Sequence, residues 1–337
     1  MMRINFIDAW VHRSVEQWGV AVGSVLLMLS LLAPTAASAQ DFGTDTISIQ
    51  DFIGTVTVRT LSAQSTEDNI RVEIKQGKTS HAVEVLDEKD RVVVRAAAGV
   101  ERTVDKCCDA RIRRSYNPRA GRTASQGPAL DEAYFADYPT LIVTVPMKAK
   151  VSFIDARIKL TMEDFDGRLD LDACYVYGET GDVDEAVVGL LDGSRLIMGD
   201  VDGGIEIDVS GDGDLKVGTA AIADVDIAGP GDVVFDRVEG MLDISVAGSG
   251  VVRANWVEGP LTVRVAGSGG AAIRDGRADR LRAIIDGSGG ILFNGLTVNP
   301  DLRLYGSSEV RLARVQGRVT HEGSGQLFVD GKLRARQ

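Results

Sequence analysis

A Gly-x-Gly triplet recurs along the second half of the sequence at a nearly constant interval. The triplets begin at Gly211, Gly229, Gly248, Gly267, Gly287, Gly306 and Gly323, where Gly306 opens the variant Gly-Ser-Ser. Self-similarity at a short period is typical of a solenoid, in which each repeat is one coil and neighbouring coils share a continuous core.

The residues that flank the triplets predict β-strands. Apolar residues occupy the second and fourth positions before each triplet and the second and fourth positions after it, with His321 as the one exception. A period of two indicates strands with one buried face and excludes helices. Glycine suits the tight corners, where a positive φ disfavours residues with a side chain. The sequence therefore predicts an all-β fold, a single-chain parallel β-helix (β-solenoid) with coils of about 19 residues. We expect a right-handed coil, because parallel β crossovers prefer that hand.

The first 39 residues have the pattern of a signal peptide. Arg3 and Arg13 precede an apolar run that is followed by small residues. Ala39 provides the small side chain that signal peptidase requires, so cleavage is predicted before Gln40. The apolar run is too short to span a bilayer as a helix.

The remainder of the chain divides around the repeat. Residues 40–100 alternate with looser spacing, which predicts either the first coils of the solenoid or a β-cap that protects its open end. Residues 101–138 interrupt the alternation as a long loop insertion. Residues 139–333 form the β-helix with its Gly-x-Gly corners, and residues 334–337 are a charged tail.

The loop insertion is basic, although the chain has a formal net charge of −12. Two interpretations remain open, a solvated loop and a binding loop for an acidic partner. The candidate binding residues are Arg111, Arg113, Arg114, Arg119 and Arg122.

The same loop carries Cys107 and Cys108, and the third cysteine of the chain is Cys174. An exported protein meets an oxidising compartment, so one disulfide is expected between Cys174 and either Cys107 or Cys108. The sequence leaves the choice open, together with a bridge between the two neighbours.

The acidic net charge argues against nucleic acid and anionic lipid as partners. No second apolar run is long enough to predict a transmembrane span in the mature chain. We therefore expect an exported protein of the periplasm, the cell surface or the extracellular space.

Carboxylates near consecutive corners raise the question of catalysis. Asp212, Asp214 and Asp232 could approach one another, as the acids of polysaccharide lyases and hydrolases do. They could also bind calcium weakly, although their spacing matches neither an EF-hand nor the nonapeptide calcium repeat. However, acids at outward positions also keep a protein with many strand edges soluble. We therefore expect no catalytic residue, no bound metal and no cofactor.

The phrases AGSG, AGSG, DGSG, YGSS and EGSG follow one another at the interval of the repeat. This series resembles the auto-transporter adhesin head GIN domain family of adhesin-like bacterial β-solenoids. The similarity covers residues 41–330 and is most specific over residues 240–330. It implies an exported β-helix with an adhesin-like role and no established catalytic residues.

Together these features predict a non-enzymatic adhesin-like or envelope scaffold protein. Its long faces or its loop would bind an envelope or extracellular protein or polysaccharide. The alternatives are a β-helix enzyme that acts on polysaccharides and a purely structural periplasmic protein.

Overall fold

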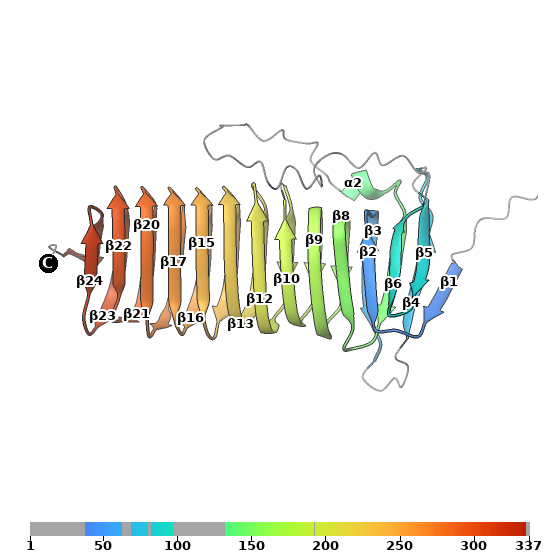
Figure 1. Cartoon of the computed structure of the whole chain (residues 1–337), viewed down its shortest axis with the longest axis horizontal. Helices are drawn as coiled ribbons and strands as arrows, with labels where there is room; N and C mark the ends of the chain where they lie inside the picture. The colour runs from blue at the N-terminus through green and yellow to red at the C-terminus, as the bar shows by residue number, and fades with distance from the viewer. Residues whose placement is uncertain (1–37, 63–68, 80–81, 98–131, 192, 335–337) are drawn as a thin grey trace, which may run out of the picture. The chain divides into compact units, whose positions relative to one another are not determined.

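Parallel strands, paired in register from one coil to the next, build the fold (Figure 1). The computed structural model describes residues 38–62, 69–79, 82–97, 132–191 and 193–334. Within the unit Ala37–Gln337 the chain forms about 9 coils spaced by about 19 residues. This confirms the predicted all-β parallel β-helix.

Each coil contributes strands to two broad faces. Face A consists, in spatial order, of β5 (Val83–Glu88), β6 (Arg91–Ala96), β2 (Thr46–Gln50), the first parts of β8 (Lys150–Met162) and β9 (Phe165–Thr180), β10 (Val183–Leu190), β12 (Val201–Ser210), the second part of β13 (Asp214–Gly229), β15 (Leu242–Gly248), β17 (Leu261–Gly267), β20 (Leu281–Gly287), β22 (Asp301–Gly306) and β24 (Thr320–Gly323).

Face B consists of β1 (Ser38–Phe42), β4 (Ile70–Lys75), β7 (Thr140–Val145), β3 (Ile53–Thr60), the second parts of β8 and β9, β11 (Arg195–Met198), the first part of β13, β14 (Asp232–Val238), β16 (Val251–Glu258), β18 (Gly270–Ile273), β21 (Gly290–Val298), β23 (Glu309–Gln316), β25 (Gln326–Val329) and β26 (Lys332–Leu333). The strand β19 (Gly276–Ala278) and the ends of its neighbours form a short third side. The described helix α2 (Glu132–Phe135) contacts β3 and β8.

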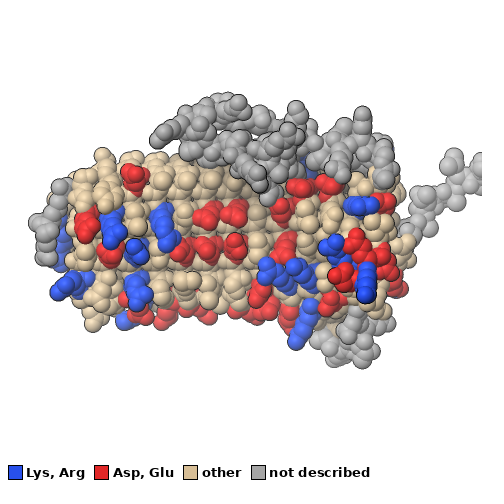
Figure 2. Space-filling view, viewed as in Figure 1, with Lys and Arg blue, Asp and Glu red and all other residues tan. Residues whose placement is uncertain are grey.

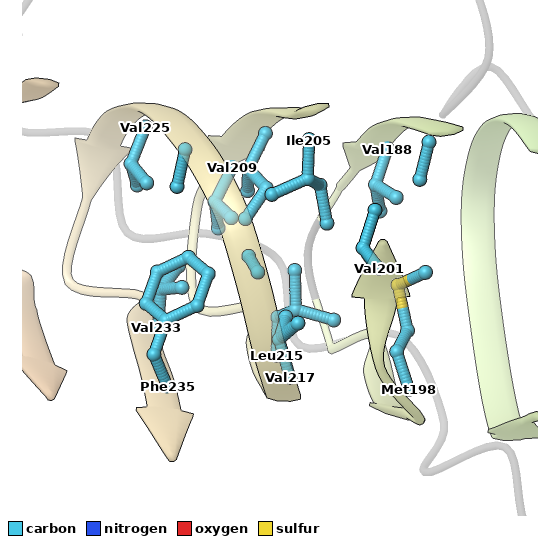
Figure 3. Packing of buried hydrophobic residues seen from close by; sticks show 14 of the residues in the cluster. Val188, Met198, Val201, Ile205, Val209, Leu215, Val217, Val225, Val233 and Phe235 are labelled. Atoms are coloured by element: carbon cyan, nitrogen blue, oxygen red, sulfur yellow. The ribbon is translucent and has the colours of Figure 1, made fainter. Parts of the chain in front are cut away.

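The core is a set of aliphatic rows that run along the axis. Val246, Val265 and Ile285 lie directly opposite one another in consecutive strands, and each is at most 3% exposed. In Figure 3, Val225 of face A points toward Phe235 of face B. Burying a side chain of this size contributes about 1.5–3 kcal/mol, so the rows stabilise every coil through its neighbours.

The glycine corners join face A to face B. Gly248, Gly267 and Gly287 stack in register with φ between 135° and 140°. The carbonyl of Gly248 accepts hydrogen bonds from the backbone N–H groups of Ser268 and Gly269, at 2.9 and 3.0 Å. A Cβ at Gly267 would collide with that carbonyl oxygen. Glycine is therefore required here by the backbone conformation and by the close approach of the next coil.

The N-terminal end consists of parallel coils followed by antiparallel strands. The strands β2 and β3 form a coil that pairs directly with β8, and β6 and β7 form the coil outside it. Spatial order thus differs from chain order. The strands β4, β5 and β1 then pair antiparallel, which ends the parallel stack in a cap.

The last coil departs from the predicted alignment. His321 lies opposite Leu302, and Gly323 lies opposite Leu304, so Gly323 does not stack on Gly306. The alignment resumes at Leu327, opposite Val310. The corner that joins β24 to β25 is shorter than the corner that joins β22 to β23. This explains why Gly323 follows Gly306 at a shorter interval than the other corners. The prediction that Gly306 and Gly323 occupy equivalent corner positions was wrong. The sequence could not distinguish the two alignments, because either one places a glycine of the Gly-Ser-Gly triplet near the turn.

We expect Gly267→Ala to lower the free energy of unfolding by about 1–3 kcal/mol, because alanine is strained at this φ and meets the Gly248 carbonyl. Chemical denaturation followed by circular dichroism measures the change. Ser268→Ala is the matched control, since truncating this exposed side chain should leave the stability almost unchanged. Equal stability of the two variants would contradict the packing described for the corner.

Candidate functional site

A shallow groove crosses five consecutive coils of face B, from β8 to β14. Alternation turns every second side chain outward, and the backbone register aligns these side chains in columns. One column runs Lys159, Tyr177, Arg195, Asp214 and Asp232, one residue from each coil. Neighbouring strands lie about 4.8 Å apart, so the column is a regular row of different functional groups.

The second column of the groove adds apolar surface and charge. It contains Glu179, Ile197, Lys216 and Val234. Ile197 is 56% exposed, and Tyr177 in the first column is 45% exposed. Exposed large apolar side chains that lie together among polar groups are typical of a binding surface.

Two cations of the groove, Arg195 and Lys216, make only long ion pairs. Arg195 Nε lies 3.8 Å from an Asp214 carboxylate oxygen, and Lys216 Nζ lies 3.6 Å from Asp236. Both distances exceed a direct hydrogen bond, and exposed ion pairs of this kind contribute at most about 1 kcal/mol. Arg195 and Lys216 can therefore exchange these partners for a ligand at little energetic cost.

Asp214 is the perturbed carboxylate of the groove. Partial desolvation raises the pKa of Asp214, whose side chain is still 58% exposed, above its ordinary value. The neighbouring charges of Asp232 and Asp212 raise it further, whereas Arg195 opposes the rise. The structure thus brings together the three carboxylates that the sequence singled out.

Two of these three carboxylates, Asp212 and Asp232, accept hydrogen bonds within the fold. Asp212 accepts a 2.6 Å hydrogen bond from the backbone N–H of Gly193. Asp232 accepts bonds from the backbone of Val251, at 3.0 Å, and from Arg253, at 2.7 Å. Each bond joins neighbouring coils. Among the described residues no group of three or more His, Cys, Asp or Glu is placed to hold a metal ion. Weak calcium binding at the three carboxylates stays a prediction.

The remaining predicted sites lie at the edge of the described part of the chain. Cys174, on β9 where face A passes to face B, is buried and disulfide-bonded, and its partner lies outside the described residues. Cys107 and Cys108 are outside them as well, as are the arginines Arg111, Arg113, Arg114, Arg119 and Arg122.

The predicted cleavage site is described in part. Ala39 and Gln40 lie in β1, paired with Glu73 and Val72 of β4. Cleavage before Gln40 stays a prediction, and it would leave Gln40–Phe42 as the paired part of the strand. Among the described residues no helix has the length and apolar character needed to cross a membrane.

Sequence reasoning missed an aromatic cluster beside the groove. Tyr134 and Tyr138 stack at 5.2 Å between ring centroids, and Phe135 stacks on Tyr175 at 6.3 Å. Tyr175 is two residues from Tyr177 on β9, so a period of two was the signal that could have placed both rings outside the core. The sequence contains no pattern that predicts α2, the short helix whose Phe135 packs against Tyr175.

No protein-family model matches the chain, and no curated protein matches it. The fold is similar to three bacterial crystal structures. A candidate lipid-binding protein from Parabacteroides distasonis ATCC 8503 is 10% identical, with a TM-score of 0.40 over 88% of this chain and 97% of that chain. A candidate adhesin from Parabacteroides merdae ATCC 43184 is 13% identical, with a TM-score of 0.33 over 87% and 96%. A candidate adhesin from Bacteroides fragilis NCTC 9343 is 12% identical, with a TM-score of 0.29 over 88% and 97%. The similarity to the GIN domain family stays a prediction.

We expect Asp214→Asn to raise the thermal unfolding midpoint at pH 7. A carboxyl whose pKa is raised in the folded state binds its proton more tightly there than in the unfolded state. The charged form is therefore unfavourable to folding. This penalty is complete above the folded pKa, shrinks as the pH falls through it, and is gone below the lower pKa of the unfolded chain. Scanning calorimetry from pH 7 to pH 3 should show the advantage of the variant shrinking with acidification.

Asp232→Asn is the matched comparison in the same column. This variant loses the ion pair with Arg253 and should be less stable than the parent at pH 7. An Asp214→Asn variant that is destabilised to the same extent would contradict the role given to burial.

Proposed function

We propose that this protein is an exported, non-enzymatic, adhesin-like scaffold that holds an extended polymer of another cell surface or envelope along the groove on face B. The observation that carries the proposal is the register of the groove, which presents Tyr177, Arg195 and Ile197 on adjacent coils. Backbone pairing fixes these positions before a ligand arrives. A preorganised surface loses little conformational entropy on binding, so more of the contact energy becomes affinity.

The side chains of the groove suit a polar polymer with apolar patches. Tyr177 offers a ring face with a hydroxyl, and tyrosine and arginine are the residue types that most often dominate binding energy. Arg195 and Lys216 can bind acidic or hydroxyl groups, while Glu179 can accept hydrogen bonds from a ligand. Because the columns run along the axis, a ligand chain can repeat the same weak contact on successive coils.

Two observations support export. Residues 1–39 have the pattern of a cleavable signal peptide. Cys174 is disulfide-bonded, and disulfides persist mainly in oxidising compartments such as the periplasm and the extracellular space.

We expect the double variant Tyr177→Ala, Arg195→Ala to bind whole cells or purified envelope polysaccharide at least tenfold more weakly than the parent. A loss of two anchors worth more than about 1 kcal/mol each produces a change of this size. Flow cytometry and biolayer interferometry with the labelled mature protein measure it.

The control for this test is Leu292→Ala, Arg274→Ala, which removes an exposed apolar side chain and an exposed arginine outside the groove. Unchanged binding by the groove variant would remove the groove from the proposal. If Arg113→Glu, Arg114→Glu abolishes binding instead, the arginine-rich loop is the binding element.

One observation favours the second candidate function, a polysaccharide-acting enzyme. Asp214 lies 3.8 Å from Arg195 in an open groove, and its pKa is shifted upward, which is the direction that a general acid requires. We expect no release of reducing ends or unsaturated sugars from acidic and neutral polysaccharides. Turnover that Asp214→Asn abolishes, with folding intact, would replace the scaffold with the enzyme.

A further inference from the structure

Face A carries an acidic ladder in its central coils. The ladder consists of Glu206, Asp208, Asp224, Asp226 and Asp243, on β12, β13 and β15 (Figure 2, two red rows near the middle). Glu206 lies opposite Asp224, which lies opposite Asp243, and Asp208 lies opposite Asp226. Side chains of like charge thus follow one another at the spacing of adjacent strands, about 4.8 Å.

This stacking is unfavourable within one molecule. Burial raises the pKa of Asp224, and the charges of Asp243, Asp226 and Glu206 raise it further. Within the described part of the chain no ion pair neutralises Glu206, Asp224 or Asp226, whereas Asp243 pairs with Arg264 at 2.6 Å. Like charges directly opposite in a sheet are destabilising, so the ladder reduces the stability of the isolated chain.

The coils that follow on the same face carry arginines at matching columns. Arg264, Arg282 and Arg303 project from β17, β20 and β22 (Figure 2, blue). Arg282 and Asp224 belong to one column of outward side chains, and Arg303 and Asp208 belong to the next column toward the glycine corners. Arg282 makes no ion pair with another described residue, and Arg303 lies 3.8 Å from Glu322. Face A therefore presents acids over three coils and arginines in the same columns over the next three.

We propose that face A is an interface between two copies of this chain, packed face to face with their axes antiparallel. The two-fold axis of this dimer runs parallel to the strands and passes between β15 and β17. Rotation about it places each column of one copy over the same column of the other copy and reverses the order of the coils. It brings Asp224 opposite Arg282 of the second copy and Asp208 opposite Arg303 of the second copy. Symmetry repeats each contact, as in any isologous dimer, so four ion pairs cross the interface.

The shape of the face agrees with this arrangement. Ala247 and Ala266 are neighbours in the column next to the corners, and both are exposed. The same axis places Ala247 of one copy opposite Ala266 of the other, and these small side chains allow the two faces to approach closely. The six coils extend about 29 Å along the axis, which gives an interface at the small end of specific ones. Charge therefore decides whether the dimer forms.

The register also contains one repulsion, which makes it testable. Glu206 falls opposite Asp301 of the second copy, so Asp301→Asn should strengthen association.

The decisive experiment is a charge swap followed by sedimentation velocity at low ionic strength. We expect the mature parent protein to be in a monomer–dimer equilibrium that roughly 0.5 M NaCl shifts to monomer, because salt screens exposed charges. Asp224→Arg and Arg282→Glu should each weaken dimerisation at least tenfold, since each homodimer then contains two repulsive contacts. An equimolar mixture of the two variants should dimerise again, because both contacts become attractive.

Arg274→Glu is the matched control, because it makes the same charge change outside face A and should leave dimerisation unchanged. Circular dichroism verifies that each variant is folded. A parent protein that stays monomeric at every concentration in low salt would overturn the proposal, as would a mixture that fails to restore the dimer. Neither outcome bears on the groove of face B, whose test is a binding assay.

Discussion

Backbone hydrogen bonds between coils, formed in parallel register, are the interaction on which the rest of this structure depends. They fix the distance from one coil to the next and place equivalent residues above one another, as with Val246, Val265 and Ile285. A parallel strand buries one row of side chains and exposes the other. Packing and surface chemistry are therefore both determined one column at a time.

The glycine corners follow from the same constraint. Where the chain passes from face A to face B, the carbonyl of one corner bonds to two N–H groups of the next, as at Gly248 and the backbone of Ser268 and Gly269. This contact leaves no room for a Cβ. Glycine is therefore repeated in the sequence for two reasons, the close approach of neighbouring coils and the positive φ of the corner.

Register also converts a repeating sequence into surfaces with different properties. On face B it aligns Lys159, Tyr177 and Arg195 in one column, which gives a groove of mixed chemistry. On face A it stacks Glu206 on Asp224, which concentrates charge of one sign. The core tolerates this variety because outward side chains do not contribute to its packing. Function can therefore differ between faces while the fold stays the same.

The sequence by itself determined the class of fold, the length of a coil, the buried rows and the glycine corners, because each follows from local periodicity. It also predicted that Asp214 could approach Asp232. Only the tertiary structure decided that β6 and β7 lie outside β2 and β3, that antiparallel strands end the stack, and that the last corner is shorter. These features depend on where the chain rejoins the stack after the segment between β6 and β7. They also depend on which strand edge is then still unpaired. Periodicity describes how one coil follows the next, but it contains no information about how the stack begins and ends.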